Sequence, residues 1–242
     1  MSIHGGHAVD VIYIDFSRAF DSVVHNKLIY KLSNFGISGD LLTWIEAFLT
    51  DRQQCVIIEH CFSSSTPVLS GVPQGSVLGP ILFILYVDDI CTICLDSNIT
   101  HKLFADDLKL YSQINTSCDN FHFQAVLDRL QQWCIDWQLK INISKCNIIH
   151  FGHKNNKFQY FLNGSPISAP ETVTDLGVEV DRQLKFDSHI NKIINKAYSR
   201  IGILFKGFAT REAHLLKQAY ITYIRPVLEY ASSVWSPIYL NI

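Results

Sequence analysis

The chain has 242 residues, 48% of them hydrophobic and 17% charged, which excludes an intrinsically disordered protein. This length can bury one large core or two small ones. The seven cysteines are odd in number and scattered, so we expect reduced thiols and an intracellular protein rather than a disulfide-stapled secreted one. The apolar run 77–87 is too short to cross a bilayer, and we see no signal peptide.

Positive charge gathers toward the C-terminus. Between residues 183 and 225 lie eight Lys or Arg and two acidic residues, although the whole chain has a net charge of −2. An acidic body with a basic helical segment fits a metal site beside a phosphate-binding surface. A solvated helix face explains the same pattern equally well, so charge alone leaves both interpretations open.

The first quarter of the chain predicts a strand, two helices and another strand. The apolar run 9–14, interrupted only by Asp10, predicts a buried strand. The spacing of apolar residues predicts helices at 26–32, closing near Gly36, and at 41–49. Residues 54–59 predict a strand. This order of elements is typical of an α+β protein.

The segment 70–80 contains three glycines and two prolines. It cannot form regular structure before Pro80, a favourable first residue for a helix that would run to Val87. A glycine-rich loop lets a ligand approach the backbone closely, and Gln74 places a polar side chain in it. A plain surface connector is the alternative, but this segment lies between two strongly apolar runs.

Two acids, Asp106 and Asp107, lie between apolar residues and predict a hairpin with an acidic two-residue tip. An ordinary turn is the simplest explanation of such a pair. The strand at 9–14, however, also ends on an acid, Asp15. Carboxylates delivered to one sheet edge form a site for a hard cation. Without one, two carboxylates about 4 Å apart repel by roughly 4 kcal/mol at an effective dielectric of 20.

Three segments together resemble the palm motifs of reverse transcriptases, in particular those of non-LTR (LINE, jockey-like) retrotransposons. They are Ile-Asp-Phe-Ser-Arg-Ala-Phe-Asp at 14–21, Ser-Gly-Val-Pro-Gln-Gly-Ser at 70–76, and Phe-Ala-Asp-Asp at 104–107. The resemblance continues in order through 133–151 and through Asp-Leu-Gly-Val at 175–178, which is similar to the primer-grip hairpin. It ends with the tail at 215–237 and so covers nearly the whole chain.

The resemblance implies an α+β reverse-transcriptase palm, an antiparallel sheet backed by helices, with partial fingers at 1–181. A truncated, thumb-like helical segment would follow at 182–242. In the family a fingers region precedes the first acid, and here it is largely missing. We therefore expect a piece of a longer retroelement polyprotein that polymerises poorly by itself.

The resemblance implies an RNA-directed DNA polymerase that transfers a nucleotide from a dNTP to a primer 3′-hydroxyl. Its partners would be an RNA template and a DNA primer, with no membrane, in the nucleus and cytoplasm. Asp15, Asp106 and Asp107 match the catalytic acids that hold two Mg²⁺ ions, for which Mn²⁺ is a plausible substitute. Two ions clamp the attacking and leaving oxygens of an in-line displacement.

Other residues match substrate positions of the family. Phe20 falls where an aromatic ring lies under the sugar and would clash with a ribose 2′-hydroxyl, although a core phenylalanine is a serious alternative. Lys145 matches a lysine that protonates pyrophosphate, although a solvated lysine would look the same. The remaining matches are Phe16, Gln74 and Gly75 at the substrate, and Leu176 and Gly177 at the primer grip.

Two further motifs are decoys. Tyr-Val-Asp-Asp at 86–89 resembles the active-site tetrad of retroviral enzymes, but it would fall at the end of a helix, so we favour Asp106 and Asp107. Cys91 and Cys94 have the spacing of zinc ligands, but no second pair of ligands follows, so we do not expect zinc.

Two other functions stay open. A catalytically inactive remnant could act as a nucleic-acid-binding or scaffold module, which the missing fingers favour and the intact acids disfavour. An unrelated Mg²⁺ phosphohydrolase would also use the acids, but it leaves the glycine-rich loop and Phe20 unexplained.

Overall fold

The computed structural model describes residues 7–94, 98–208 and 212–236. The chain divides into two compact units, Met1–Ala169 and Pro170–Ile242, and each is described by itself. The division falls before the expected palm–thumb boundary at 181/182, because the hairpin formed by β11 (Thr172–Asp175) and β12 (Val178–Asp181) packs with the helices that follow it. Both units combine helices with antiparallel strands, so the predicted α+β class is confirmed.

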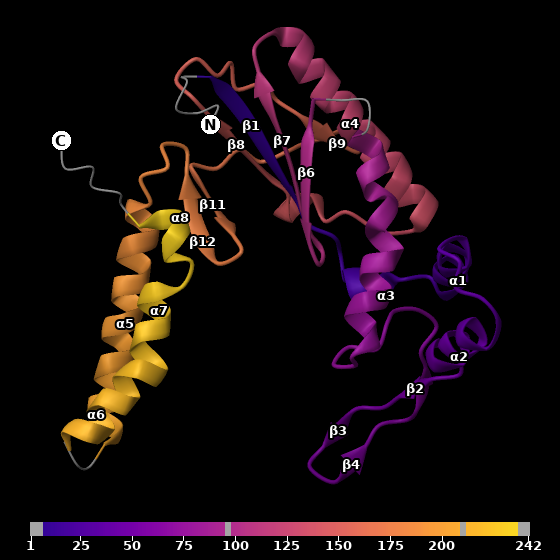
Figure 1. Ribbon diagram of the computed structural model, residues 1–242, viewed down its shortest axis with the longest axis horizontal. Helices are drawn as coiled ribbons and strands as arrows, with labels where there is room; N and C mark the ends of the chain where they lie inside the picture. The colour runs from indigo at the N-terminus through magenta and orange to yellow at the C-terminus, as the bar shows by residue number, and fades with distance from the viewer. Residues whose placement is uncertain (1–6, 95–97, 209–211, 237–242) are drawn as a thin grey trace. The chain divides into compact units, whose positions relative to one another are not determined.

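The first unit is built on a four-stranded antiparallel sheet with the order β6-β7-β1-β8 (Figure 1). Its strands are β1 (Ala8–Ile14), β6 (Thr100–Phe104), β7 (Asp107–Ile114) and β8 (Asn147–Phe151). The strand predicted at 9–14 is therefore confirmed and lies inside the sheet. Ile12 pairs with Leu110 on one side and Ile148 on the other, and all three are buried. This central position explains why β1 is apolar almost throughout.

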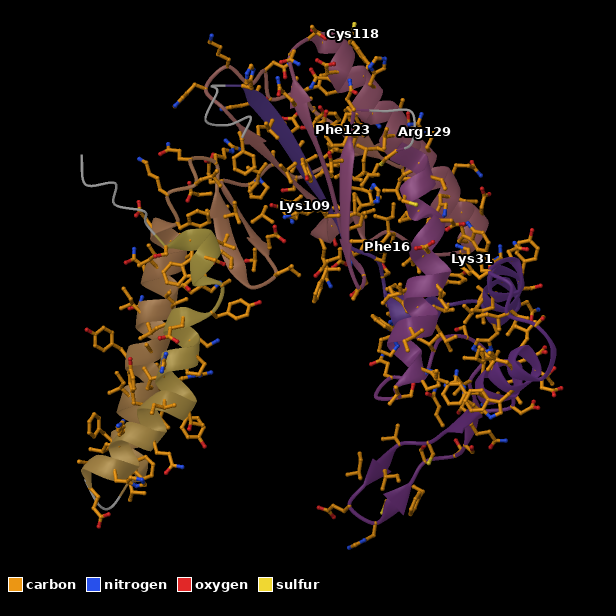
Figure 2. All side chains as sticks on the ribbon, viewed as in Figure 1. Phe16, Lys31, Lys109, Cys118, Phe123 and Arg129 are labelled. Atoms are coloured by element: carbon orange, nitrogen blue, oxygen red, sulfur yellow. The ribbon has the colours of Figure 1, made fainter. Side chains whose placement is uncertain are left out.

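Helices pack against this sheet and beside one another. They are α1 (His25–Asn34), α2 (Gly39–Leu49), α3 (Leu78–Val87) and α4 (Ser117–Trp137), with the short 3-10 segments η1 (Ala19–Ser22), η2 (Asp88–Cys94) and η3 (Ile143–Lys145). The helices predicted at 26–32 and 41–49 are confirmed, as is the one expected to end at Val87. Phe123 of α4 is fully buried against the sheet (Figure 2).

The prediction of one strand at 54–59 is wrong. The segment instead forms β2 (Gln53–Gln54) and β3 (Ile57–Ile58), which pair with β5 (Thr66–Pro67) and β4 (Cys61–Phe62). The chain reverses directly after β3, where Glu59 has a positive φ of 54°. The result is a narrow two-stranded arm whose apolar side chains are exposed, so their pattern is no guide to burial.

Asp10, the polar interruption in β1, is completely buried and fully bonded. Its carboxylate lies 2.6 Å from Nδ1 of His150, and it accepts hydrogen bonds from Tyr160 and Asn155, each at 2.7 Å. Tyr160 follows β8, and the small hairpin of β9 (Phe161–Leu162) and β10 (Ser165–Pro166) comes next. A buried charge is tolerated where it is paired in this way.

Lys31 ties α1 to the ends of α3 and α4. Its ammonium donates to the Tyr86 carbonyl, pairs with Asp89 at 2.5 Å and lies 3.6 Å from the centre of the Trp137 ring. Trp133 donates its Nε1–H to the same Asp89 carboxylate at 3.0 Å. Burial lowers the pKa of Lys31, and the Asp89 contacts oppose that shift. Lys31 is therefore a buried charge held by its partners (Figure 2).

The second unit is mainly helical after its hairpin. It contains α5 (Asp187–Gly207), α6 (Ala213–Ala219), the π-helical turn η4 (Tyr220–Ile224), α7 (Arg225–Glu229) and α8 (Ser232–Trp235). The long α5 packs against β12, η4 and α7. Across the described parts of both units, no helix combines the length and apolarity that a membrane crossing needs.

Replacing Lys31 by alanine should lower the free energy of unfolding of the first unit by about 3 kcal/mol, since it leaves the Asp89 carboxylate without its cation. Urea unfolding followed by tryptophan fluorescence, which reports on Trp133 and Trp137, measures this. Lys154→Ala is the control, because this exposed lysine should change stability by less than about 0.5 kcal/mol. Equal stability of the two variants would contradict a stabilising role for the buried ion pair.

Candidate active site

The register of the sheet brings the three predicted acids to one edge. The last pair of the β1–β7 ladder is Ile14 with Leu108, so Asp15 and Asp107 follow directly on the same side of that pair. Phe104 pairs with Asp107 across β6 and β7, which leaves Ala105 and Asp106 in the turn (Figure 1). The tip is thus one residue earlier than predicted, because Ala105 takes the positive φ (53°) that starts the turn.

Asp15 has a buried carboxylate oxygen that the fold does not satisfy. Among the described residues its Oδ1 has no hydrogen-bond partner, and the nearest cation is the Lys145 ammonium at 3.8 Å. Buried polar atoms are normally hydrogen-bonded, so an exception requires an explanation. A carboxylate oxygen in this state fits a hard cation as ligand.

The acids share an edge without forming a closed cage. Within the described ranges no group of three or more His, Cys, Asp or Glu side chains lies close enough together to hold a metal ion. Carboxylate oxygens are ligands that Mg²⁺ prefers, so the donors at this edge suit a hard cation in chemical type, although the three side chains do not converge on one point.

Asp15 is fixed in place by the segment that leads into η3. Its carbonyl accepts a hydrogen bond from the Asn142 amide at 2.8 Å, and Ser17 donates to the Lys140 carbonyl at 2.7 Å. Phe16 forms an isolated bridge with Ile141, and its side chain is only 4% exposed. Any contact of Phe16 with a substrate would therefore go through its backbone.

The glycine-rich loop lies against the chain that follows Asp15. The Gly71 and Val72 amides donate to the carbonyls of Val23 and Phe20, at 2.8 and 2.9 Å. The Gln74 carboxamide donates to the Asp21 carboxylate at 2.8 Å. The backbone carbonyl of Asp21 accepts a hydrogen bond from the Ser70 hydroxyl. Asp21 therefore orients the predicted substrate residue Gln74. Neighbouring Gly75 has a positive φ of 80° and open space around its Cα.

Phe20 packs on the core through one face of its ring. Its ring stacks on the buried Phe83 of α3, with centroids 4.2 Å apart and planes 24° from parallel. The side chain is only half-buried, so it packs on the core without being enclosed by it.

Sequence reasoning missed two residues of this site. Asp21 closes the motif at 14–21, but the match assigns it no role, and its contacts depend on a loop about fifty residues away. Cys146 is buried beside Asp15, and burial raises the pKa of its thiol to about 11. Its Sγ donates weakly to the Asn142 carbonyl at 3.3 Å, so the thiol helps to hold the segment that supports Asp15.

The two decoy motifs lie elsewhere in the first unit. Asp88 and Asp89 start η2 at the end of α3, where no strand is present, and Asp89 is already bonded to Lys31 and Trp133. Cys91 and Cys94 belong to the same 3-10 segment. No group of metal-binding side chains surrounds them in the part of the chain that is described.

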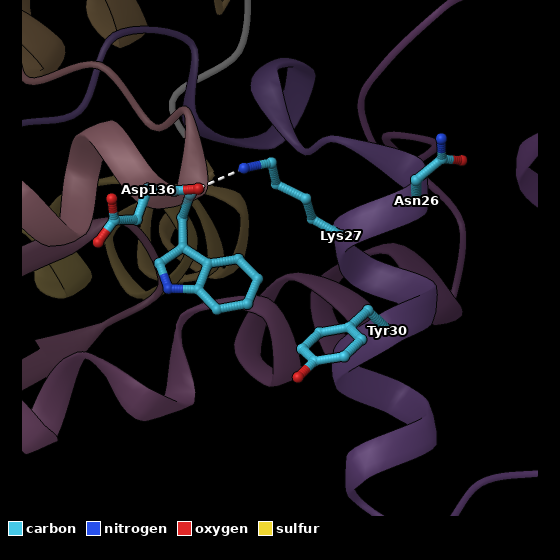
Figure 3. Close-up of a pocket in the computed structure, with 5 residues that line it drawn as sticks. Asn26, Lys27, Tyr30 and Asp136 are labelled. Carbon is cyan, nitrogen blue, oxygen red and sulfur yellow. Dashed lines mark hydrogen bonds between the residues drawn. The ribbon is translucent and has the colours of Figure 1, made fainter.

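An open pocket of about 430 Å³ lies between α1 and the end of α4 (Figure 3). Its lining is Asn26, Lys27, Tyr30, Asp136 and Trp137, and the Lys27 ammonium donates to the Asp136 carbonyl. None of the predicted site residues contributes to it.

In the second unit, Leu176 and Gly177 form the two-residue turn between β11 and β12. Both have positive φ, 45° and 85°, as a tight mirror-image hairpin turn requires. Several basic residues of this unit already have partners. Lys192 pairs with Glu179 at 2.6 Å, Arg225 pairs with Glu229 at 2.8 Å, and Arg200 donates to a backbone carbonyl. These contacts weaken the interpretation of the basic segment as a purely phosphate-binding surface.

The chain was compared with models of known protein families. The family profile described as "Reverse transcriptase (RNA-dependent DNA polymerase)" matches residues 4–180. The chain belongs to the reverse transcriptase family. The match contains the three acids, the glycine-rich loop and the hairpin of β11 with most of β12.

Known relatives of this reverse transcriptase chain come from mobile elements. It is 31% identical over 188 residues to "RNA-directed DNA polymerase from mobile element jockey" of Drosophila melanogaster, covering 75% of this chain and 20% of the relative. It is 26% identical over 238 residues to "Probable RNA-directed DNA polymerase from transposon BS" of the same species, covering 93% and 26%. The jockey-like resemblance is confirmed. The chain spans about a fifth to a quarter of these relatives' length.

Among solved structures, the chain is similar to telomerase from Candida tropicalis in complex with the TWJ fragment of telomeric RNA. The TM-score is 0.54 at 11% identity, covering 92% of this chain and 38% of that one. At this identity the likeness concerns the fold alone, and it agrees with the reverse-transcriptase architecture expected from the motifs.

Gly71→Ala should destabilise the first unit by at least about 2 kcal/mol, because the new Cβ would lie 2.7 Å from the Asp21 Cα at a φ of +87°. Urea unfolding measures the loss. Gly202→Ala in α5 is the control, since no atom lies within 4 Å of its new Cβ and helix propensity favours alanine there by up to about 1 kcal/mol. A Gly71 variant as stable as the unmodified chain would show that the loop does not need this close approach.

Proposed function

We propose that the chain is the polymerase centre of an RNA-directed DNA polymerase from a non-LTR retrotransposon. The observation that carries the proposal is the β1–β7 register, which brings Asp15 to the edge where Asp106 ends the β6–β7 turn and Asp107 begins β7. Family membership and the order of the motifs support it. The substrates would be dNTPs, an RNA template and a DNA primer.

In this proposal Asp15, Asp106 and Asp107 are the catalytic acids and hold two Mg²⁺ ions, or Mn²⁺ in their place. When bound, the ions activate the attacking 3′-hydroxyl and neutralise the leaving pyrophosphate. The unsatisfied Oδ1 of Asp15 supports a cation at this edge. The hydrogen bonds between the 15–17 segment and the 140–142 segment keep the Asp15 backbone in place, so that part of the site does not have to be ordered when substrate binds.

The substrate roles follow from the neighbours of the acids. Phe20 would lie under the sugar and exclude a ribose 2′-hydroxyl, with Phe83 behind it as a rigid support. Gln74, oriented by Asp21, and Gly75 would contact the incoming base and template, and Phe16 would contribute its backbone. Lys145, whose ammonium lies 3.8 Å from Asp15, would donate a proton to the leaving pyrophosphate.

We further propose that the first unit is the palm and that the second begins with the primer grip, Leu176 and Gly177, and continues as a thumb. The chain covers a fraction of its relatives' length, so we infer that it works within a longer polyprotein. We place that protein inside the cell, in the nucleus and cytoplasm.

Mg²⁺ should raise the unfolding temperature of the chain, because a ligand at about 100 times its Kd adds about 2.7 kcal/mol of stability. Asp106→Asn should abolish this effect, whereas Asp88→Asn, in the decoy motif, should keep it. Differential scanning fluorimetry with and without Mg²⁺ measures the three proteins. Equal stabilisation of both variants would place the metal elsewhere and remove the basis for the proposal.

Primer extension on an RNA template tests the reaction itself. We expect weak, Mg²⁺-dependent incorporation of dNTPs that Asp106→Asn reduces by at least about 100-fold, equivalent to roughly 3 kcal/mol of lost transition-state stabilisation. Asp88→Asn should retain it. Release of inorganic phosphate from dNTPs without extension would instead indicate a phosphohydrolase. Template binding with no turnover would indicate an inactive, nucleic-acid-binding remnant.

A further inference from the structure

We propose that Tyr230 is a positioning residue that holds the Leu176–Gly177 turn in shape. The Tyr230 hydroxyl donates a hydrogen bond to the Leu176 carbonyl at 2.9 Å. The ring continues under the turn, since a Cβ added to Gly177 would meet the Tyr230 Cε1 at 3.4 Å. The role rests on the proposed function, in which this turn grips the primer.

The turn needs outside support because its sequence does not favour its shape. Both turn residues have positive φ, and a leucine in that region is strained, whereas asparagine or glycine is preferred there. The two strands have four residues each and form a sheet of only two strands. Isolated hairpins of this size are marginally stable in water. A strained turn persists only where its surroundings hold it.

Tyr230 is itself held by the segment that follows it. Trp235 donates its Nε1–H to the Tyr230 carbonyl at 2.8 Å, and the Trp235 ring lies 5.5 Å from the ring of buried His189. Nδ1 of His189 accepts from the Glu179 amide on β12 at 3.2 Å. Burial lowers the pKa of His189, which keeps that nitrogen available as an acceptor. These contacts connect the turn of the hairpin, through the tail, to its second strand.

Core packing does not explain this arrangement. The Tyr230 side chain is 56% exposed, so it buries little apolar area, and its contribution lies in the single directed hydrogen bond and the ring beneath the turn. Because Tyr230 touches the turn and not the reacting atoms, we assign it a positioning role. Loss of the hydroxyl would release the Leu176 carbonyl and let the turn shift where the primer end would lie.

The test compares Tyr230→Phe, which removes only the hydroxyl, with Tyr198→Phe as control. Tyr198 lies on α5 of the same unit and is 69% exposed. Amide hydrogen exchange at residues 175–178 should become about fivefold faster in Tyr230→Phe, since a hydrogen bond of this kind contributes about 1 kcal/mol, and should not change in Tyr198→Phe. The unfolding temperature of Tyr230→Phe should fall by about 2–4 °C, as a loss of about 1 kcal/mol gives for a chain of this size, and that of Tyr198→Phe should match the unmodified chain.

Primer binding separates a positioning role from a merely structural one. Fluorescence anisotropy with a labelled DNA primer annealed to an RNA template should show severalfold weaker binding by Tyr230→Phe and unchanged binding by Tyr198→Phe. Unchanged exchange at the turn would overturn the proposal, and so would faster exchange with unchanged primer affinity. Failure of the proposed function gives a different result, in which the unmodified chain does not bind the primer at all.

Discussion

The antiparallel register between β1 and β7 is the constraint on which the rest of the site depends. In a strand the side chains alternate between two faces, so a slip of one residue would turn every side chain of β1 to the opposite face. The buried pairs Ile12–Leu110 and Ile14–Leu108 oppose such a slip, since it would turn Ile12 and Ile14 away from the core that they share with the two leucines. Core packing therefore sets the place of Asp15 relative to the β6–β7 turn. The position of the acids at the edge thus depends on packing in the middle of the sheet, where β7 alternates buried and partly exposed side chains along a β1 that is buried almost throughout.

Three aspartates of the first unit differ in how far the fold satisfies their carboxylates. Asp10 is surrounded by donors from His150, Tyr160 and Asn155, and Asp89 is neutralised by Lys31 and the Trp133 indole. The carboxylates of Asp10 and Asp89 thus have their hydrogen-bond and ion-pair partners within the protein. Asp15 differs because one of its oxygens is buried without a hydrogen bond among the described residues. In the proposed function, this unsatisfied oxygen is the one that would bind a cation.

Sequence periodicity was sufficient to predict the strands and helices whose apolar residues are buried in the core. The apolar run of β1, the spacing in α1 and α2, and the proline near the start of α3 each predicted the right element, and the motifs identified the acids. The arm at 53–67 was misassigned because its apolar residues are exposed, so the usual link between pattern and burial fails there. The contacts of Asp21, Cys146 and Tyr230 join residues that are distant in sequence, and no local pattern encodes them. The bridge between Phe16 and Ile141 is equally distant in sequence, and the family match that gave Phe16 a substrate role did not indicate that its side chain is buried.

The bond between Lys31 and Asp89 also affects how experiments on such proteins are interpreted. If Asp89 were substituted because the Tyr-Val-Asp-Asp motif resembles a catalytic tetrad, an inactive variant would be taken as proof that Asp89 is catalytic. Such a loss would not distinguish a chemical role from the removal of the carboxylate to which Lys31 and Trp133 donate. Inactivation separates chemistry from architecture only when the folded state of the altered protein is checked alongside it.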